Sequence, residues 1–430
     1  MAILPNVIVW SLVAFSRAVV GLRGGPPHIP SKSLPPSQDP WYTAPVGFES
    51  QAPGAILRIR QSPGNIVNIT GNCSKVYNIL YRTTDSRYRP TWAVTTLFVP
   101  EKPKLSNKAL LSYQIPYNTV NVDASPSFSL QTEPSSDIVE ALGRGWYVNT
   151  PDFEGPLAAN VAGIQEGHAT LDSLRAALAA GVGLRRDARV ALWGYSGGSI
   201  ASEWALEFQE QYAPELKISG AALGGLVANN THCIDMVQNG PLAYIAVGAM
   251  MGPLIQHPKA FQRLISQLKT SGPYNKTGFL AAFHLNGGEF DYYAGQNIYD
   301  YFVNGAAVLH DPLIRQTLLE NQFMTYHGVP RSPLFIYKAI ADEATAIEDS
   351  DYYVERNCML GANILYERNT VGGHLDEYAN GVPRARVWLG SVLDGSYPDK
   401  YQTRGCIIKD VAIGAIGATD PSTGGRPGQK

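Results

Sequence analysis

The chain has 430 residues, of which 45% are hydrophobic and 16% are charged, and its formal net charge is -2. This size allows one large core or two domains, and the lack of a long basic run leaves nucleic-acid binding without electrostatic support. The four cysteines form no C-x-x-C pair, so zinc and dithiol redox sites are not expected. Their even number favours two disulfides, for which three connectivities exist.

The first twenty residues have the features of a secretory signal peptide. Residues 7–15 form an apolar stretch too short to span a bilayer, and the SRA sequence at 16–18 supplies small residues for cleavage. Glycosylation sequons of the form N-x-S/T begin at Asn68, Asn72, Asn229 and Asn275. These sites agree with secretion, and we predict an extracellular protein with a signal peptide over residues 1–20.

Residues 21–45 are rich in proline and predict an extended arm rather than a packed element. Two segments rich in β-branched and aromatic residues, at 76–85 and 91–100, then predict a hairpin. The elements predicted next are a strand at 108–114, a helix at 134–145, a strand from 146, a helix at 163–178, a strand at 188–195, a helix at 198–212 and a strand at 217–225. Strands separated by helices in this way predict a parallel sheet with helices on both faces, over residues 46–226.

The alternation stops after residue 226, and about 100 residues separate the strand that ends there from the next one. Because this length far exceeds a normal crossover, we predict an inserted helical cap at 227–330. The core resumes over residues 331–410, before a short tail at 411–430. Its predicted elements are a strand at 333–342, a helix at 349–361, a strand at 362–368 and a final helix at 384–395.

The sequence GYSGG places Ser196 between a predicted strand and a predicted helix. A G-x-S-x-G motif in this context predicts a sharp turn that exposes the serine, with small neighbours where strand and helix pass closely. The backbone N–H of Gly197 then points to where an oxyanion would form, at the positive end of a helix. A plain turn between strand and helix is the alternative, and we favour a nucleophile at Ser196.

A serine nucleophile needs a base, and in the α/β-hydrolase arrangement the order along the chain is serine, acid, histidine. His374 is the only histidine beyond residue 327, in a predicted loop between the last strand and the final helix. Asp342 follows the apolar run of the preceding strand, where an acid would hold the imidazole. The rival acids are Glu343, Asp349 and Asp351. The last two lie near a predicted helix start, where carboxylates often act only as helix caps.

A second oxyanion donor is expected from the loop that follows the strand at 108–114. This loop has no H-G-G-G motif, and the best candidate is Asn118, through its backbone N–H or its side chain.

The chain resembles the fungal secretory lipases of the lipase A type over residues 40 to about 415. The segments that carry the resemblance are YRTTDSRYRPTWAVTTLFVP, SYQIPYN, GWYVNTPDFEGPLAANVAGIQEG, GYSGGS, YKAIADE and GANILYERNTVGGH. The resemblance implies an α/β-hydrolase core with a helical cap and a Ser-Asp-His triad. Its catalytic residues fall on Ser196, Asp342 and His374, and its oxyanion donors fall on Gly197 and position 118.

The chain departs from the family at three places. Position 118 is commonly acidic in the family and is Asn118 here, and a family cysteine is replaced by Ala124. The resemblance implies a Cys358–Cys406 bridge that braces the His374 loop, and leaves Cys73–Cys233 as a substitute pair. The family has a longer C-terminal flap over the site, whereas only 24 residues follow Cys406 here, so the lid behaviour of the family is not carried over.

These features favour a secreted serine carboxylic-ester hydrolase of the triacylglycerol-lipase type. It would form an acyl-enzyme with a small-molecule or lipid ester, in transient contact with a lipid interface, with no metal or organic cofactor. The alternatives are an esterase or deacylase for a small acylated metabolite and an acyltransferase on the same fold. The apolar cap segment 241–255 either lines the substrate pocket or packs within the cap. The sequence leaves the oligomeric state open.

Overall fold

The computed structural model describes residues 33–103, 108–285 and 288–414. Its centre is a ten-stranded sheet in the order β1-β2-β3-β5-β4-β6-β7-β8-β9-β10. The strands are β1 Ile56–Gln61, β2 Cys73–Thr84, β3 Pro90–Pro100, β4 Ala109–Gln114, β5 Tyr147–Pro151, β6 Arg189–Tyr195, β7 Ile218–Gly224, β8 Leu334–Ala339, β9 Ile364–Asn369 and β10 Cys406–Val411. In this order, the neighbouring pairs from β5 to β10 are parallel. The pairs β1–β2, β2–β3 and β3–β5 are antiparallel.

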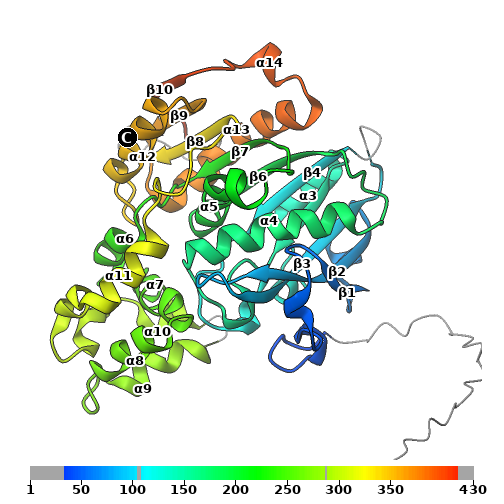
Figure 1. Cartoon of the computed structure of the whole chain (residues 1–430). Helices are drawn as coiled ribbons and strands as arrows, with labels where there is room; N and C mark the ends of the chain where they lie inside the picture. Colours follow the sequence, from blue (N-terminus) through cyan, green and yellow to red (C-terminus); the bar gives the residue numbers. More distant parts are fainter. Residues whose placement is uncertain (1–32, 104–107, 286–287, 415–430) are drawn as a thin grey trace, which may run out of the picture.

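Helices cover both faces of this sheet (Figure 1). The helices are α1 Ile66–Thr70, α2 Pro126–Ser129, α3 Ser136–Gly143, α4 Gly163–Ala179, α5 Gly197–Tyr212, α6 Asn230–Val237, α7 Ala243–Ile255, α8 Pro258–Ser266, α9 Lys276–Phe279, α10 Glu289–Tyr293, α11 Pro312–Gln322, α12 Ile347–Met359, α13 His374–Asp394 and α14 Tyr397–Lys400. One buried apolar cluster joins α4, α5 and α12 to the sheet, and a second joins α3 and α13. Because both faces are covered, the central strands are buried throughout, as their continuous apolar runs predict.

The helical insertion lies between β7 and β8 and contains α6 to α11, which gather at one end of the sheet (Figure 1). The chain enters and leaves it at one narrow neck. Asn229 and Phe323 form an isolated antiparallel bridge, and the N–H of Met324 donates to the carbonyl of Ala228 at 3.3 Å. The neck therefore holds the two ends of the insertion side by side.

The proline-rich segment differs from the prediction of an extended arm where the structure describes it. Pro40–Tyr42 forms a 3-10 helix with Asp39 at its N-cap, since proline suits the first helical position. Asp39 pairs with Arg60 at 2.8 Å, and the Arg60 guanidinium lies 4.0 Å from the ring centre of Trp41. This part of the arm packs on the core, while the predicted signal peptide and residues 21–32 lie outside the described residues.

The helix that carries His374 begins ten residues earlier than predicted. We expected a loop from 369 to 383 and a final helix at 384–395, whereas α13 starts at His374 and runs through Pro383. Gly381 and Pro383 lowered the helical signal of its first half. Gly381 packs against the ring of Tyr337, where a side chain on residue 381 would lie 2.0 Å from a ring carbon.

The disulfide expectation is correct for one pair and wrong for the other. Cys358 at the end of α12 bonds to Cys406 at the start of β10. Cys73 and Cys233 are free thiols, half-buried and buried respectively, so the predicted Cys73–Cys233 pair is wrong. The physical reason is their placement, because Cys73 starts β2 near one edge of the sheet, whereas Cys233 lies in α6 of the insertion.

The four sequons lie in two kinds of surroundings. Asn68 and Asn72 are exposed, whereas Asn229 and Asn275 are half-buried and cap α6 and α9 with their side-chain oxygens. Glycosylation at these positions stays a prediction.

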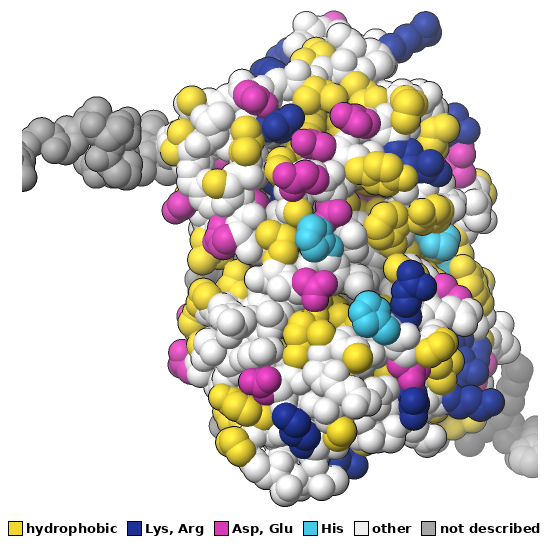
Figure 2. All heavy atoms as spheres, turned by 90° about the vertical axis from the view of Figure 1, so that its left-hand side faces the viewer, with side chains coloured by type: hydrophobic (Ala, Val, Ile, Leu, Met, Phe, Trp, Pro, Cys, Tyr) yellow, Lys and Arg dark blue, Asp and Glu magenta, His cyan; other side chains and the backbone are white. Residues whose placement is uncertain are grey.

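The surface that faces the viewer in Figure 2 mixes acidic, basic and apolar side chains over the core and the insertion. Of the helices that the structure describes, none combines the length and the apolar character needed to cross a bilayer.

Candidate active site

Ser196 occupies a sharp turn between β6 and α5. Its backbone has φ 52° and ψ -122°, a left-handed conformation that is rare for a residue with a side chain. The neighbouring glycines allow this turn: a Cβ on Gly194 would lie 2.0 Å from the carbonyl oxygen of Gly198, and one on Gly198 would lie 1.9 Å from that of Gln114. The turn therefore requires glycine at both positions and lifts the Ser196 side chain above the carboxyl edge of the sheet.

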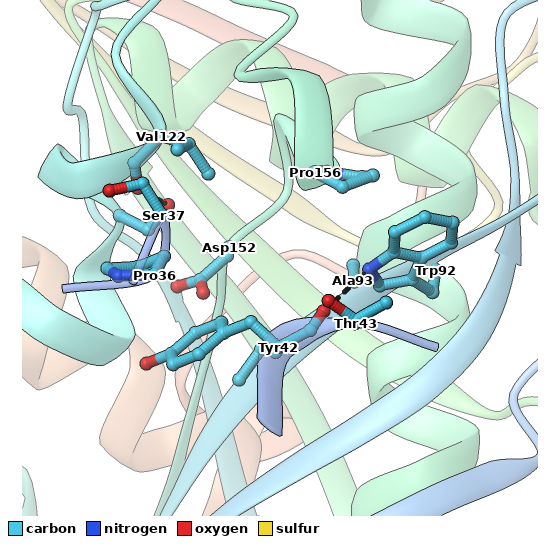
Figure 3. Close-up of a pocket in the computed structure, with 12 residues that line it drawn as sticks. Pro36, Ser37, Tyr42, Thr43, Trp92, Ala93, Val122, Asp152 and Pro156 are labelled. Carbon is cyan, nitrogen blue, oxygen red and sulfur yellow. Dashed lines mark hydrogen bonds between the residues drawn. The ribbon is translucent and has the colours of Figure 1, made fainter. Parts of the chain in front are cut away.

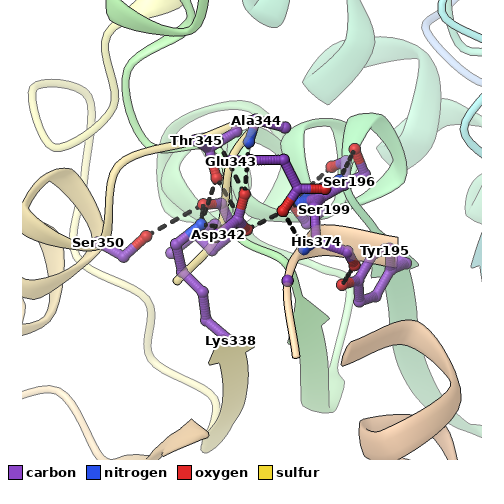
Figure 4. Close-up of polar contacts among 12 residues, drawn as sticks. Tyr195, Ser196, Ser199, Lys338, Asp342, Glu343, Ala344, Thr345, Ser350 and His374 are labelled. Carbon is purple, nitrogen blue, oxygen red and sulfur yellow. Dashed lines mark hydrogen bonds and ion pairs between the residues drawn. The ribbon is translucent and has the colours of Figure 1, made fainter. Parts of the chain in front are cut away.

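The structure brings together the three residues that the sequence singled out (Figure 4). The Oγ of Ser196 lies 2.9 Å from Nε2 of His374, and Nδ1 of His374 lies 2.8 Å from Oδ2 of Asp342. His374 and Asp342 are buried, at 3% and 6% exposed, and Ser196 is half-buried. An ionised carboxylate only accepts hydrogen bonds, so Nδ1 carries the proton and Nε2 is free to accept from the serine hydroxyl.

The carboxylate of Asp342 is held by a compact set of donors. Its Oδ1 accepts from the N–H groups of Ala344 and Thr345, each at 2.9 Å, and its Oδ2 also accepts from Lys338 at 2.8 Å. Burial alone would raise the pKa of Asp342, but the hydrogen bond from His374 and the charge of Lys338 bring it below its ordinary value. Asp342 is therefore ionised at neutral pH.

The rival acids have other partners. Glu343 accepts the backbone N–H of His374 at 2.8 Å and so fixes the start of α13. Asp349 lies 2.7 Å from Nδ1 of His232, and Asp351 pairs with Arg368 at 3.5 Å. Of the four acidic residues considered, Asp342 is the one that contacts the imidazole ring of His374 in the structure.

Two residues missed by the sequence analysis also hold the histidine and the acid. Tyr195, next to the serine, donates its hydroxyl to the backbone carbonyl of His374. Lys338 reaches Asp342 from within β8, four residues earlier along the chain. In the sequence, the only sign of this contact is that Lys338 and Asp342 carry opposite charges four residues apart. This spacing is equally typical of an exposed ion pair on a helix.

Gly197 and Asn118 lie against each other beside Ser196. A Cβ on Gly197 would lie 2.1 Å from Oδ1 of Asn118, so only glycine leaves room for this amide. Asn118 has φ 43° and follows β4 in the chain. The N–H of Gly197 is at the N-terminus of α5, where the helix dipole favours negative charge.

A cavity of about 240 Å³ lies farther along the same edge of the sheet, at the end of β5 (Figure 3). The aromatic side chains of Tyr42 and Trp92 and the carboxyl group of Asp152 line it. Burial raises the pKa of Asp152 to about 7, against the effect of hydrogen bonds from Ser127. In the described ranges no group of three or more His, Cys, Asp or Glu side chains is arranged to hold a metal ion.

The sequence and the structure both match known ester hydrolases. The chain is 47% identical over 408 residues to a trichothecene C-3 esterase of Fusarium sporotrichioides, covering 91% of each chain. It is 34% identical to lipase A of Arthroderma benhamiae, covering 85% of this chain and 81% of that protein. The crystal structure of Candida antarctica lipase A in its closed state superposes with a TM-score of 0.78 at 28% identity, covering 90% and 92% of the two chains.

These matches confirm the α/β-hydrolase fold and a carboxylic-ester hydrolase activity. Residues 120–400 match the secretory lipase family, a range that includes Ser196, Asp342 and His374. The chain belongs to the secretory lipase family.

Proposed function

We propose that this ester hydrolase works through an acyl-enzyme on Ser196. The observation that carries the proposal is the continuous chain of hydrogen bonds from Ser196 through His374 to Asp342. The Oγ of Ser196 attacks the ester carbonyl while Nε2 of His374 takes its proton. Collapse of the tetrahedral intermediate breaks the bond to the alcohol, which leaves with that proton. Water then attacks the acyl-enzyme by the reverse sequence of proton transfers.

The oxyanion of the tetrahedral intermediate would bind between Gly197 and Asn118. The N–H of Gly197 at the start of α5 and the N–H or amide of Asn118 converge on the space beside Ser196, as their close contact supports. Donors that are fixed before the substrate arrives stabilise developing charge without reorganisation, so we assign these two residues to the oxyanion hole.

For the substrate, we propose an acylated small metabolite of the trichothecene class, which is hydrolysed to a free alcohol and a carboxylic acid. Support comes from the higher identity to the trichothecene C-3 esterase, 47%, than to the Arthroderma lipase, 34%, at similar coverage. A triacylglycerol lipase is the second candidate, favoured by the structural match to lipase A. Transfer of the acyl group to another alcohol would use the same acyl-enzyme.

Labelling and a substrate panel test the proposal. A fluorophosphonate probe should label the wild type and the Ser266→Ala variant, whose exposed serine lies on the insertion, but not Ser196→Ala. An acetylated trichothecene should be hydrolysed faster than an emulsified triglyceride, and an added alcohol should not divert the acyl group. Equal labelling of Ser196→Ala would refute the nucleophile, and a preference for the emulsion would favour the lipase.

We also propose that the protein is secreted after removal of residues 1–20. The secretory lipase family and the apolar leader support this proposal. N-terminal sequencing of the protein from the culture medium of a fungal expression host tests it, and an intact Met1 there would contradict cleavage.

A further inference from the structure

Lys338 is a fully buried lysine beside the acid of the triad. Its side chain is 0% exposed, and its ammonium group donates to Oδ2 of Asp342 at 2.8 Å, to the carbonyl of Leu226 at 3.3 Å and to the hydroxyl of Thr345. Figure 4 shows the lysine reaching up from β8 to the turn that carries Asp342. A lysine without exposed surface is rare unless its charge is compensated, so this position calls for an explanation.

The hydrogen-bond partners of this lysine suit its charged form. Three acceptors surround Nζ, and Thr345 uses its own hydroxyl hydrogen on Oδ2 of Asp342, at 3.3 Å. An ammonium group has three hydrogens, one for each of these acceptors, and the carboxylate of Asp342 beside it compensates its charge. Burial lowers the pKa of Lys338, and the negative charge of Asp342 opposes that effect.

The same carboxylate oxygen serves both the lysine and the histidine. Oδ2 of Asp342 accepts from Lys338 and from Nδ1 of His374, each at 2.8 Å. A lone buried carboxylate carries a large desolvation cost and tends to take up a proton, which would end its use as an acceptor from Nδ1–H. A fixed positive charge at this oxygen prevents protonation and sets the direction in which the carboxylate faces.

We propose that Lys338 is a positioning residue that keeps Asp342 ionised and aimed at His374. This inference rests on the proposed function, because it concerns the same triad. A second effect follows from the shared oxygen: the lysine offsets part of the negative charge that the imidazole experiences. Without the lysine the pKa of Asp342 would be higher, because the charge of Lys338 is one of the causes that lower it.

Other groups near the lysine do not replace its charge. Cys233 faces it from α6, and burial raises the pKa of this thiol to about 12, so it is neutral. Asp349 of α12 lies beside His232, and Glu343 is used by the N–H of His374. Among these neighbours Lys338 supplies the positive charge that contacts Asp342.

The test begins with Lys338→Met, which keeps the length of the side chain and removes its charge. We expect kcat/KM to fall about 30-fold and the acid limb of its pH profile to move up by about one unit, because nothing then offsets Asp342. The matched control is Lys409→Met, which should change neither quantity. Lys409 is half-exposed on the edge strand β10 and pairs with Glu367 of β9. An unmoved pH profile in Lys338→Met would overturn the proposal.

A double-mutant cycle with Asp342→Asn separates positioning from packing. If the lysine acts through the acid, Lys338→Met should change kcat/KM less than about threefold when Asp342 is already Asn. An equal factor in both backgrounds would show a general packing role and contradict the inference. Activity that survives Ser196→Ala would instead refute the proposed function, so the two failures are distinct.

Thermal stability provides a further test in case Lys338→Met does not fold. Removal of one partner leaves a buried charge without compensation, whereas removal of both does not. Lys338→Met with Asp342→Asn should therefore fold and melt at a higher temperature than Lys338→Met alone. If the double variant is as unstable as the single variant, the lysine acts through packing, and the proposal is overturned.

Discussion

At the scale of single residues, Ser196 and Asn118 share an unusual backbone conformation. Ser196 and Asn118 have φ angles of 52° and 43°, a conformation that costs on the order of 1 kcal/mol for a residue with a side chain. Ser196 is held there by its N–H, which donates to the carbonyl of Gly224 at 2.9 Å. The strained turn and the amide of Asn118 meet at Gly197, so this glycine is the most sensitive position of the predicted oxyanion hole.

Gly197→Ala should therefore lower kcat about 100-fold, since its Cβ would lie 2.1 Å from Oδ1 of Asn118 and displace one donor. KM should change little, because the donor acts on the transition state rather than on the bound ester. Steady-state kinetics on a soluble ester measures both. The control is Gly288→Ala at the start of α10, where a Cβ would meet no atom within 4 Å. A fully active Gly197→Ala would contradict the oxyanion assignment.

At the scale of elements, the edge strand β10 supports the segment before His374. It pairs in parallel with β9, and the N–H of Thr370 donates to the carbonyl of Val411 at 2.8 Å. The disulfide from Cys406 to Cys358 ties the start of this strand to α12. Because an edge strand pairs with a neighbour on one side only, we expect the bridge to contribute much of the stability of β10.

Replacement of both Cys358 and Cys406 by Ser should destabilise the protein by about 4 kcal/mol, from the chain entropy of a 48-residue loop. Calorimetry should show a lower Tm, and activity should be lost at a lower temperature than in the wild type. Cys73→Ser, which changes a free thiol, is the control and should melt near the wild type. Equal melting of the oxidised and reduced wild type would contradict this expectation.

The elements also show what the sequence could and could not predict. Long apolar strands and the helices between them were predicted within a few residues, because both faces of the sheet are buried and the pattern is strong. The strands β1 and β10 were missed, since their side chains are half-buried or exposed and their pattern is weak. The early start of α13 was missed because tertiary packing of Gly381 on Tyr337 outweighs the low helix propensity of that segment.

The predicted site shows the same division. Ser196, Asp342 and His374 each follow a strand, so their meeting at one edge of the sheet could be predicted from order alone. The pair Cys73–Cys233 could not be judged, because the distance between a residue of β2 and a residue of α6 depends on the whole fold. Lys338 was read as part of an apolar strand, and only burial on both faces reveals its charge as a feature of the site.

At the scale of the whole molecule, several buried carboxyl groups lie outside the proposed triad. Burial raises the pKa of Glu203, with a further contribution from Glu207, and raises that of Glu154, with a further contribution from Glu166. The pKa of Asp172 is raised to about 6 by burial. In the unfolded chain these groups ionise near their ordinary values, so the folded state binds more protons at intermediate pH. Their stabilisation is complete below about pH 4 and is lost as pH rises through the higher folded values.

We therefore expect the Tm at pH 5 to exceed that at pH 8 by about 5 °C, as measured by calorimetry, because the raised pKa values of the carboxyl groups outweigh the opposite effect of the lowered pKa of His168. Asp342 does not reverse this sign, because its lowered pKa affects stability only below about pH 4. Glu203→Gln should raise the Tm at pH 8 and leave it nearly unchanged at pH 5. The exposed Glu355→Gln serves as the control, and a Tm difference unaltered by Glu203→Gln would contradict the assignment to this residue.

The neck between Asn229 and Phe323 makes the helical insertion an exchangeable unit. A segment that enters and leaves at adjacent residues can be replaced through recombination without any change in the register of β7 or β8. We expect a transplanted insertion to keep the core intact where its other contacts to the core are retained, such as those of Gln256 with Gln165 and of Glu289 with Thr119. The same two junctions are where chimaeras between esterases and lipases of this family should be joined.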